Sequence, residues 1–367
     1  MNYICKNCGK EFSIKETIWK CECGGLLHLK YEKKPIDFKK TACSIDHSLW
    51  KYIDALPFEK EDVWQKVTLG EGGTPVIPIQ KNVYAKADYY MPTLSFKDRG
   101  AAVLIAMAKK VNMKQVVADS SGNAGTAISA YSARAGIQCD VFVPASTSEK
   151  KLKQIAAHGA NLHKIEGSRE KTAQAAIDMV ENNSVFYASH IYNPFFWEGT
   201  KTYFYEVFEQ MGKMPDVFII PVGNGTLLMG GYIAFCELME WGYIDKMPQI
   251  LAVQAENCAP IANAFFEGKQ TVKACENKGT LAEGIAIAAP ARGAEILQAI
   301  QATKGDMITV CEQEIANARE ELAKQGIYIE ITSAANYAAY LSYLKTHEDF
   351  KNKTVVFPLC GAGIKSN

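Results

Sequence analysis

Lys97 is the residue whose type and setting first suggest chemistry. It stands in the stretch Ser95-Phe96-Lys97-Asp98-Arg99, in the first turn of a helix that we expect to continue through the apolar segment at residues 101–109. A lysine in a weakly polar setting loses proton affinity, and its neutral amine can then form a Schiff base with a carbonyl group. Taken alone, such a stretch more often marks a helix start whose charges are solvated.

Two closely spaced cysteine pairs near the N-terminus suggest a metal site. Each pair is followed by glycine, which lets the backbone turn so that its amides point at the sulfur atoms. Four thiolates at this spacing suit a tetrahedral structural Zn²⁺ ion, and the single residue within the second pair predicts a knuckle-like turn there. The alternative is two redox-active or simply free cysteine pairs. The expected zinc ligands are Cys5, Cys8, Cys21 and Cys23.

Two turns of small residues follow expected strands and are suited to binding anions. Residues 223–226, Gly-Asn-Gly-Thr, stand between an apolar strand and an apolar helix, where free amides and the positive helix end favour a phosphate. Residues 120–123, Ser-Ser-Gly-Asn, offer amides and an amide side chain to a carboxylate or a phenolic oxygen. Each turn by itself is explained about as well by tight strand–helix packing or by a Ser/Asn helix cap.

Alternating strands and helices must position these turns. Continuous β-branched runs separated by helical segments are typical of parallel sheets in a doubly wound α/β fold, where ligands bind past the carboxyl ends of the strands. We expect helices to end at Ala135 and to cover residues 149–158. The expected strands are residues 76–79, 83–87, 116–118, 139–144, 161–165, 185–188, 217–222, 250–255, 307–310 and 354–358.

The overall charge excludes partners that recognise charge alone. Lys+Arg and Asp+Glu both number 40, so that no net charge attracts nucleic acid or a membrane surface. The sequence has no apolar run long enough to cross a bilayer and no signal-peptide pattern. Its 11 cysteines are an odd number and are mostly scattered singly, as in proteins of a reducing compartment. We therefore expect a cytoplasmic protein.

Four motifs, in order along the chain, resemble those of fold-type-II pyridoxal-phosphate enzymes, and among these the threonine synthases. They are residues 92–100 (PTLSFKDRG), 121–125 (SGNAG), 221–226 (PVGNGT) and 360–365 (CGAGIK). The resemblance implies two parallel-sheet α/β domains of the tryptophan synthase β type, preceded by a small zinc ribbon. The implied division is a zinc-ribbon-like segment at 1–40, a linker with the first strands of the large domain at 41–90, a smaller mobile domain at 91–200 and a large cofactor-binding domain at 201–367.

The resemblance also implies how pyridoxal 5′-phosphate is held. Lys97 would bind it as a Schiff base and later move protons as base and acid, and Asn123 would hydrogen-bond its phenolic oxygen. Cys360 would stand beside the pyridine nitrogen, where a neutral side chain limits carbanion delocalisation and suits elimination. Without the motif, Cys360 would be taken for a core cysteine. The phosphate would lie in the loop formed by Gly223, Asn224, Gly225, Thr226 and Leu227.

The implied substrate is a small amino acid. Its carboxylate would be bound by Ser120, Ser121 and Gly122, and Glu283 would meet its amine or the cofactor. A homodimer is a further expectation drawn from the family.

Three positions depart from the threonine synthase pattern. Leu94 replaces the usual glycine, Ala362 replaces a histidine, and Phe196 falls where the family carries an arginine for the phosphate of O-phosphohomoserine. A phenyl ring cannot pair with a phosphate as a guanidinium does. His190 or Lys201 is a candidate to compensate.

Three hypotheses about function follow. The first is a lyase that converts O-phospho-L-homoserine and water to L-threonine and phosphate. The second is a pyridoxal-phosphate ammonia-lyase or β-replacing enzyme acting on a small non-phosphorylated amino acid such as threonine or serine. The third is a non-enzymatic zinc-ribbon interaction protein on a degenerate α/β scaffold.

Overall fold

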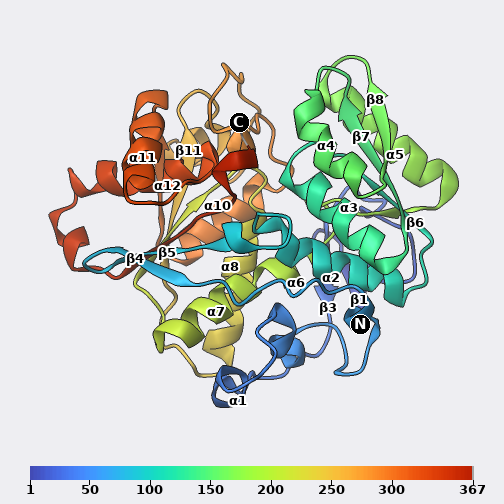
Figure 1. The fold of residues 1–367 in the computed structure, drawn as a ribbon, viewed down its shortest axis with the longest axis horizontal. Coiled ribbons are helices and arrows are strands. Elements are labelled where there is room, and N and C mark those ends of the chain that lie inside the picture. The colour runs from blue at the N-terminus through green and yellow to red at the C-terminus, as the bar shows by residue number, and fades with distance from the viewer. Residues whose placement is uncertain (366–367) are drawn as a thin grey trace. The chain divides into compact units, whose positions relative to one another are not determined.

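The computed structural model describes residues 1–365, which form two compact units (Figure 1). Unit 1 comprises residues 1–72 and 97–200, and unit 2 comprises residues 73–96 together with the chain from residue 201 onward. Both units are discontinuous in sequence. A division into domains at residues 40, 90 and 200 stays a prediction, because compactness alone does not establish which segments fold independently.

Unit 1 begins with a small antiparallel sheet in the strand order β2-β1-β3. Its strands are β1 (Asn2–Cys5), β2 (Glu11–Ser13) and β3 (Leu27–Lys30). Three short helical segments follow, α1 (Phe38–Ala42), η1 (Leu49–Ala55) and η2 (Val63–Lys66).

The main sheet of unit 1 has four parallel strands in the order β8-β7-β6-β9. They are β6 (Gln115–Ala118), β7 (Gln138–Pro144), β8 (Asn161–Ile165) and β9 (Phe186–Tyr187). The helices are α2 (Lys97–Lys110), α3 (Asn123–Ala135), α4 (Glu149–Ala157), α5 (Arg169–Asn183) and α6 (Phe195–Thr200). Because the strands are parallel, the turns that follow them gather at one edge of the sheet.

Unit 2 contains a six-stranded sheet in the order β12-β11-β10-β13-β5-β4. The strands are β4 (Val76–Gln80), β5 (Val83–Lys86), β10 (Val217–Pro221), β11 (Gln249–Ala255), β12 (Asp306–Val310) and β13 (Val355–Pro358). Only the edge strand β4 runs antiparallel, and its Pro78, which has no backbone N–H to donate, is tolerated at a sheet edge. This antiparallel edge was not among the predictions.

The α-helices of unit 2 are 7 to 15 residues long. They are α7 (Thr202–Met211), α8 (Thr226–Glu240), α9 (Pro260–Phe266), α10 (Gly293–Ala302), α11 (Glu312–Lys324) and α12 (Ile331–Leu344). Short 3₁₀ segments lie at η3 (Asp88–Tyr90), η4 (Glu283–Ile285), η5 (Glu348–Asn352) and η6 (Gly363–Lys365). The small buried side chains of α12, such as Ala335 and Ala339, let this helix pack closely on the central strands.

The predicted α/β pattern is confirmed. Each expected strand is present, with ends that differ from the prediction by at most one or two residues, and the parallel sheets are present in both units. The helix predicted to continue through residues 101–109 has Lys97 as its first residue. Within residues 1–365, no helix combines the length and apolar character needed to cross a membrane.

Candidate active site and cysteine cluster

Lys97 begins helix α2 in unit 1, and the two charges that follow it are not solvated. Asp98 and Arg99 are both completely buried, which contradicts the alternative of a helix start with exposed charges. Lys97 itself is half-buried, and its Nζ lies 5.6 Å from the centroid of the Phe196 ring. A lysine that shares its surroundings with an aromatic face and a buried helix start is partly desolvated, as a Schiff-base lysine requires.

Phe196 packs directly on α2 because Gly100 leaves room for its ring. A methyl group placed on Gly100 would lie 2.6 Å from Cγ of Phe196 and closer still to other ring carbons. Only a residue without a side chain therefore lets the fully buried ring of Phe196 lie against the helix, one turn after Lys97. The ring forms an apolar wall beside the lysine.

His190 lies on the other side of the contact with Phe196, where its buried imidazole packs on the ring. It follows β9 in a loop that is pinned by Ser189, whose Oγ accepts hydrogen bonds from the amides of Ile191 and Tyr192. The imidazole is 7% exposed, and its ring centroid lies 5.9 Å from that of Phe196 in an edge-to-face arrangement. Burial, and then the positive charges of Lys97 and Arg169, hold the pKa of His190 well below its usual range, so the imidazole is neutral near pH 7.

The turn at residues 120–123 joins β6 to α3 and is shaped for close backbone approach. A methyl group on Gly125 would overlap the carbonyl of Ser120, so glycine is needed where the turn folds back on the helix. Gly122 is the N-cap and gives no side-chain hydrogen bond, and the first bond of the helix runs from the Thr126 amide to the Gly122 carbonyl, at 3.1 Å. The preceding amides of the first turn have no acceptor within the helix and can bind a carboxylate.

Asp119 lies just before this turn and was not singled out from the sequence. It is 8% exposed, and burial raises the pKa of its carboxyl group, although the nearby charge of Arg169 opposes the rise. Arg169 is the first residue of α5 and is exposed. The carboxyl ends of β6, β8 and β9 thus bring an acid, an arginine and a histidine to the same edge of the unit 1 sheet.

In unit 2, the loop at residues 223–226 forms a cradle that fits a phosphate. Gly225 has a left-handed backbone (φ 73°), caps α8 without a side chain, and has no room for one because Ile296 lies 2.5 Å from where its Cβ would be. Gly223 is equally enclosed, since its Cβ would lie 3.1 Å from the Gly284 carbonyl. The first helical bond runs from the Met229 amide to the Gly225 carbonyl, at 2.8 Å, so the amides that precede Met229 in the first turn form no bond within the helix.

Cys360 and Glu283 lie in unit 2 as well. Cys360 follows β13 and is 2% exposed; its amide donates to Ser333 Oγ at 2.8 Å and its carbonyl accepts from the Phe96 amide at 2.9 Å. Glu283 is exposed in η4, next to Gly284, whose amide donates to Thr332 Oγ1 at 3.1 Å. The segment that carries Glu283 therefore packs on the Gly223 turn, as the contact between Gly223 and Gly284 requires.

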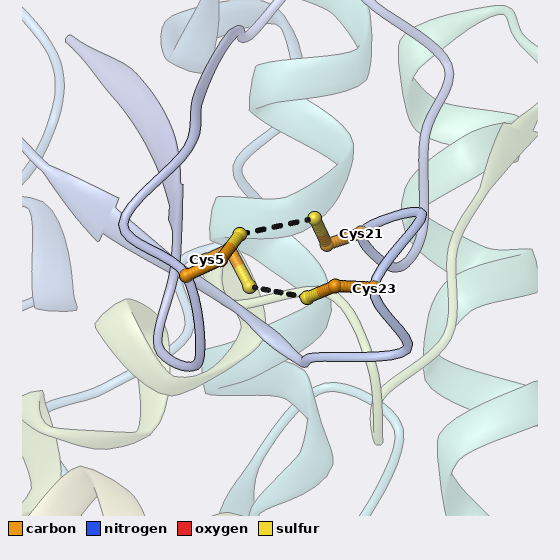
Figure 2. Close-up of side chains that lie close together, drawn as sticks. Cys5, Cys21 and Cys23 are labelled. Carbon is orange, nitrogen blue, oxygen red and sulfur yellow. Dashed lines mark hydrogen bonds between the residues drawn. The ribbon is translucent and has the colours of Figure 1, made fainter.

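The four N-terminal cysteines converge on one point. Cys5 and Cys23 have their sulfurs 3.5 Å apart, Cys8 and Cys21 3.6 Å apart, and all four sulfurs lie within 4.8 Å of one another. Figure 2 shows Cys5 and the pair Cys21 and Cys23 pointing toward each other from facing turns. Four sulfurs bound to one Zn²⁺ at about 2.3 Å in a tetrahedron would be about 3.8 Å apart, so the cluster fits this ion.

The turns that carry the cysteines have the predicted knuckle geometry. Gly9 and Gly24 have left-handed backbones (φ 74° and 80°), and their amides donate to the carbonyls of Cys5 and Cys21. A methyl group on Gly25 would lie only 2.5 Å from the Cys5 sulfur. Glycine is therefore needed both to turn the chain and to make room for a thiolate.

Aromatic contacts join the cysteine-bearing sheet to helix α6 and to the loop after β9. Tyr3 packs edge-to-face on Phe195 with ring centroids 5.7 Å apart, and His28 lies 5.5 Å from Trp197. Trp19 packs on Tyr192 at 4.9 Å. These residues carry no motif, so that the packing of the cysteine-bearing segment on the helix with Phe196 could not be predicted.

The structure thus groups the predicted residues by unit. Unit 1 holds Lys97, the turn at 120–123 and the four cysteines, and unit 2 holds the glycine loop, Glu283 and Cys360. Sequence analysis singled out His190 but missed Asp119 and Arg169, whose only signal was their place directly after strands of one parallel sheet.

Comparison with known proteins identifies the family. The model of the pyridoxal-phosphate dependent enzyme family matches residues 67–361. The threonine synthase of Methanocaldococcus jannaschii is 32% identical over 98% of this chain and 92% of its own length, and that of Methanosarcina acetivorans is 34% identical over 96% and 89%. Maize serine racemase, at 20% identity, has the same fold with a TM-score of 0.70 over 79% of this chain and 88% of its own. The resemblance seen in the four motifs is confirmed, and this chain belongs to the pyridoxal-phosphate dependent enzymes as a threonine synthase-like lyase of fold type II.

Proposed function

We propose that this chain converts O-phospho-L-homoserine and water to L-threonine and phosphate. The observation that carries the proposal is similarity to threonine synthases along nearly the whole chain, including the N-terminal segment. The half-buried Lys97 beside the Phe196 ring supports it, because this is the setting in which a lysine amine becomes reactive.

The residues assigned to pyridoxal phosphate come from the four motifs. Lys97 would hold the cofactor covalently, Asn123 would donate to its phenolic oxygen, and the amides of residues 223–227 would hold its phosphate. Cys360 would meet the pyridine nitrogen as a neutral group. When bound, the cofactor supplies an electron sink for negative charge that forms next to the substrate's amino group.

The chain's own groups would then bind the substrate and move its protons. Ser120, Ser121 and Gly122 would bind the substrate carboxylate with the first-turn amides of α3, and Glu283 would meet the substrate amine. Lys97 Nζ would take the proton from the substrate's α carbon and return it later, as a base and then an acid. The apolar Phe196 ring would keep bulk water from this amine.

Product analysis tests the reaction. Purified protein with its cofactor is given O-phospho-L-homoserine, threonine or serine separately, and phosphate, threonine and 2-oxo acid are assayed. We expect phosphate and threonine from the first substrate, loss of both in Lys97→Ala, and no loss in Lys153→Ala, which removes an exposed lysine of α4. Absence of phosphate release from the wild-type protein would refute the proposal.

A second candidate is an ammonia-lyase or β-replacing activity on threonine or serine. The observation in its favour is Phe196, an apolar residue where an arginine was expected for the substrate phosphate. Release of a 2-oxo acid from threonine or serine, without reaction of the phosphorylated substrate, would establish this alternative.

We also propose that Cys5, Cys8, Cys21 and Cys23 bind one structural Zn²⁺ ion. The convergence of four sulfurs supports it, and such small ribbons depend on metal for folding. Metal analysis should find about one zinc per chain and a large loss in Cys8→Ser, whereas Cys43→Ser, at an exposed cysteine outside the cluster, should retain it. Equal zinc content in both variants would exclude the cluster as the site. A homodimer and a cytoplasmic location stay predictions.

A further inference from the structure

The start of helix α12 is fixed by the strand end that carries Cys360. The Glu330 amide donates to the Gly361 carbonyl at 2.9 Å, and Ile329 and Ala362 are antiparallel bridge partners. Helix α12 begins directly after Glu330, which is its N-cap. The first turn of α12 therefore keeps a defined position relative to Cys360, because the backbone just before it is paired with the backbone just after that cysteine.

Two neighbouring hydroxyl groups in this first turn accept hydrogen bonds from different segments of unit 2. Thr332 Oγ1 accepts from the Gly284 amide at 3.1 Å, and Ser333 Oγ accepts from the Cys360 amide at 2.8 Å. The two hydroxyl-bearing residues are 8% and 0% exposed. A buried amide that loses its acceptor is costly, so each hydroxyl holds its backbone partner in place. One helical turn thus joins the segment that carries Glu283 to the segment that carries Cys360.

The contact continues from Gly284 to the glycine loop. A methyl group on Gly284 would lie 2.9 Å from Thr332 Oγ1, and a methyl group on Gly223 would lie 3.1 Å from the Gly284 carbonyl oxygen and 3.2 Å from Cα of Ile285. The Gly223 turn and the Gly284 segment therefore pack backbone against backbone, with no side chain between them that could absorb a shift. A displacement of Gly284 is passed on to Gly223, so the Thr332 hydroxyl supports the glycine loop through one intermediate.

The strand end next to this turn has polar atoms that are buried and unpaired. Asn336, three residues after Ser333, donates from Nδ2 to the Pro358 carbonyl at 3.0 Å. Its Oδ1 has no hydrogen-bond partner among residues 1–365, and neither has Oγ of Ser95, which is the bridge partner of Gly361. Both residues are 0% exposed. Such atoms are expected where a bound molecule or an ordered water completes the pairing, which sets this region apart from ordinary core packing.

We propose that Thr332 and Ser333 are positioning residues that hold the nitrogen side and the phosphate side of the cofactor site at a fixed separation. Ser333 fixes the backbone of Cys360, the group assigned to the pyridine nitrogen, and Thr332 fixes the segment that supports the Gly223 turn, assigned to the phosphate. The nitrogen and the phosphate-bearing carbon of pyridoxal phosphate belong to one rigid ring, so the elements that hold them must stay in register. These roles rest on the residue assignments made for the proposed function, and each hydroxyl acts through a backbone amide.

Two forms of the cofactor separate the two roles. The cofactor-free full-length chain is titrated with pyridoxal phosphate and with pyridoxal, which lacks the phosphate, and the absorbance of the bound form is followed. We expect Thr332→Val, which removes the hydroxyl and keeps the shape, to weaken binding of pyridoxal phosphate about 5- to 100-fold and that of pyridoxal by about twofold or less. Ser333→Ala should weaken both to the same extent. Thr332→Ser, which keeps the hydroxyl, should bind pyridoxal phosphate as the wild-type chain does. Equal weakening of both forms in Thr332→Val would overturn its link to the phosphate side.

A signal from the cofactor ring reports on Cys360. With pyridoxal phosphate labelled with ¹⁵N at the ring nitrogen, we expect Ser333→Ala to shift the ¹⁵N resonance of the bound cofactor, because the released Cys360 backbone changes the contact of its thiol with that nitrogen. Thr332→Val should leave the resonance in place. An unchanged resonance in Ser333→Ala would overturn the role given to Ser333.

Thr303→Val is the matched control for the loss of a buried hydroxyl group in unit 2. Thr303 is 2% exposed, and its Oγ1 donates to the Ala299 carbonyl at 3.0 Å at the end of α10. We expect Thr332→Val, Ser333→Ala and Thr303→Val all to lower the melting temperature, and only the first two to weaken cofactor binding. If Thr332→Val lowers the melting temperature as the control does and binds both forms of the cofactor like the wild-type chain, its hydroxyl only stabilises the fold and the proposal is wrong.

These measurements use no substrate, so their results do not depend on the reaction. Absence of phosphate release from O-phospho-L-homoserine by the wild-type protein would remove the proposed function, and the titrations would then decide the positioning roles by themselves. Phosphate release by the wild-type protein, together with unchanged cofactor affinity in Thr332→Val and Ser333→Ala, would overturn the positioning roles and leave the proposed function standing.

Discussion

Gly100→Ala is the substitution whose effect follows most directly from the structure. Gly100 is an interior residue of α2, where alanine in place of glycine normally stabilises a helix by about 1 kcal/mol. Here the added methyl group would lie 2.6 Å from Cγ of Phe196, although non-bonded carbon atoms prefer about 3.5–4.0 Å. The ring or the helix must move by about 1 Å, and overpacking of this kind costs roughly 1–3 kcal/mol.

The net effect depends on whether the Phe196 ring is present. In the wild-type chain we expect Gly100→Ala to destabilise unit 1 by about 1–2 kcal/mol, because the overlap outweighs the helix propensity. Phe196→Ala alone should cost about 3–5 kcal/mol, since it empties a fully buried site. In that background Gly100→Ala should instead stabilise by about 1 kcal/mol. The coupling between the two positions is then about 2–3 kcal/mol.

Urea unfolding of the four proteins measures this cycle. Tryptophan fluorescence reports mainly on unit 1, because Trp19, Trp50, Trp64 and Trp197 lie there and only Trp241 lies in unit 2. The sign of the Gly100→Ala effect should reverse between the two backgrounds. If Gly100→Ala stabilises both to the same extent, the ring does not rest on Gly100, and the wall beside Lys97 is misplaced.

Three further predictions concern other parts of the chain. Leu94 has a left-handed backbone (φ 62°), which glycine adopts without strain and a β-branched residue does not. Leu94→Val should therefore destabilise the protein by about 1–2 kcal/mol in urea unfolding, and Leu94→Gly should not. Equal losses would show that side-chain packing matters more than backbone strain. Thr226→Asp places an anion at the cradle and should weaken retention of pyridoxal phosphate on dialysis at least tenfold. The melting temperature of the cofactor-free protein should stay the same or rise, because an acidic residue stabilises the N-terminus of a helix. Unchanged retention would mean that the loop does not hold the cofactor. Burial opposes ionisation of Asp140, but hydrogen bonds led by that of His163 outweigh it and hold the pKa of Asp140 below its usual range. This carboxylate therefore contributes stability that is present above about pH 4 and lost as pH falls through the folded-state pKa. In Asp140→Asn the free energy of unfolding should fall less steeply as pH is lowered. A free energy of unfolding that falls with pH as it does in the wild-type protein would contradict this role of Asp140.

The sequence was sufficient for most of the fold because the strand signals are strong. Residues 217–221 and 250–253 are continuous apolar runs that are almost entirely buried, and such runs are typical of a parallel sheet. The short strand β9, of two residues, and the antiparallel β4 are weaker signals, because edge pairing depends on what lies beside the strand in space.

The site was predictable only where function leaves a local motif. Lys97, the glycine loop and the cysteine pairs each need special residues at short spacing, so they are visible in the sequence. Arg169 and Asp119 depend on tertiary placement, since each is an ordinary polar residue after a strand until the parallel sheet brings both to the edge where His190 follows β9. The contact between Gly100 and Phe196 spans nearly a hundred residues and leaves no trace in either local sequence.

The strand order of unit 2 also determines when during synthesis the protein can fold. Strand β13, residues Val355–Pro358, pairs with β10 on one side and with β5 on the other. Until β13 leaves the ribosome, the β4–β5 pair has no further strand to join, and β10, β11 and β12 form an incomplete sheet. All of unit 1 precedes residue 201, so its segments leave the ribosome before β10, β11, β12 and β13, while β4 and β5 can pair only with each other. Deletion of β13, residues Val355–Pro358, would therefore leave β5 and β10 with unpaired edges, and exposed strand edges of this kind are where aggregation begins.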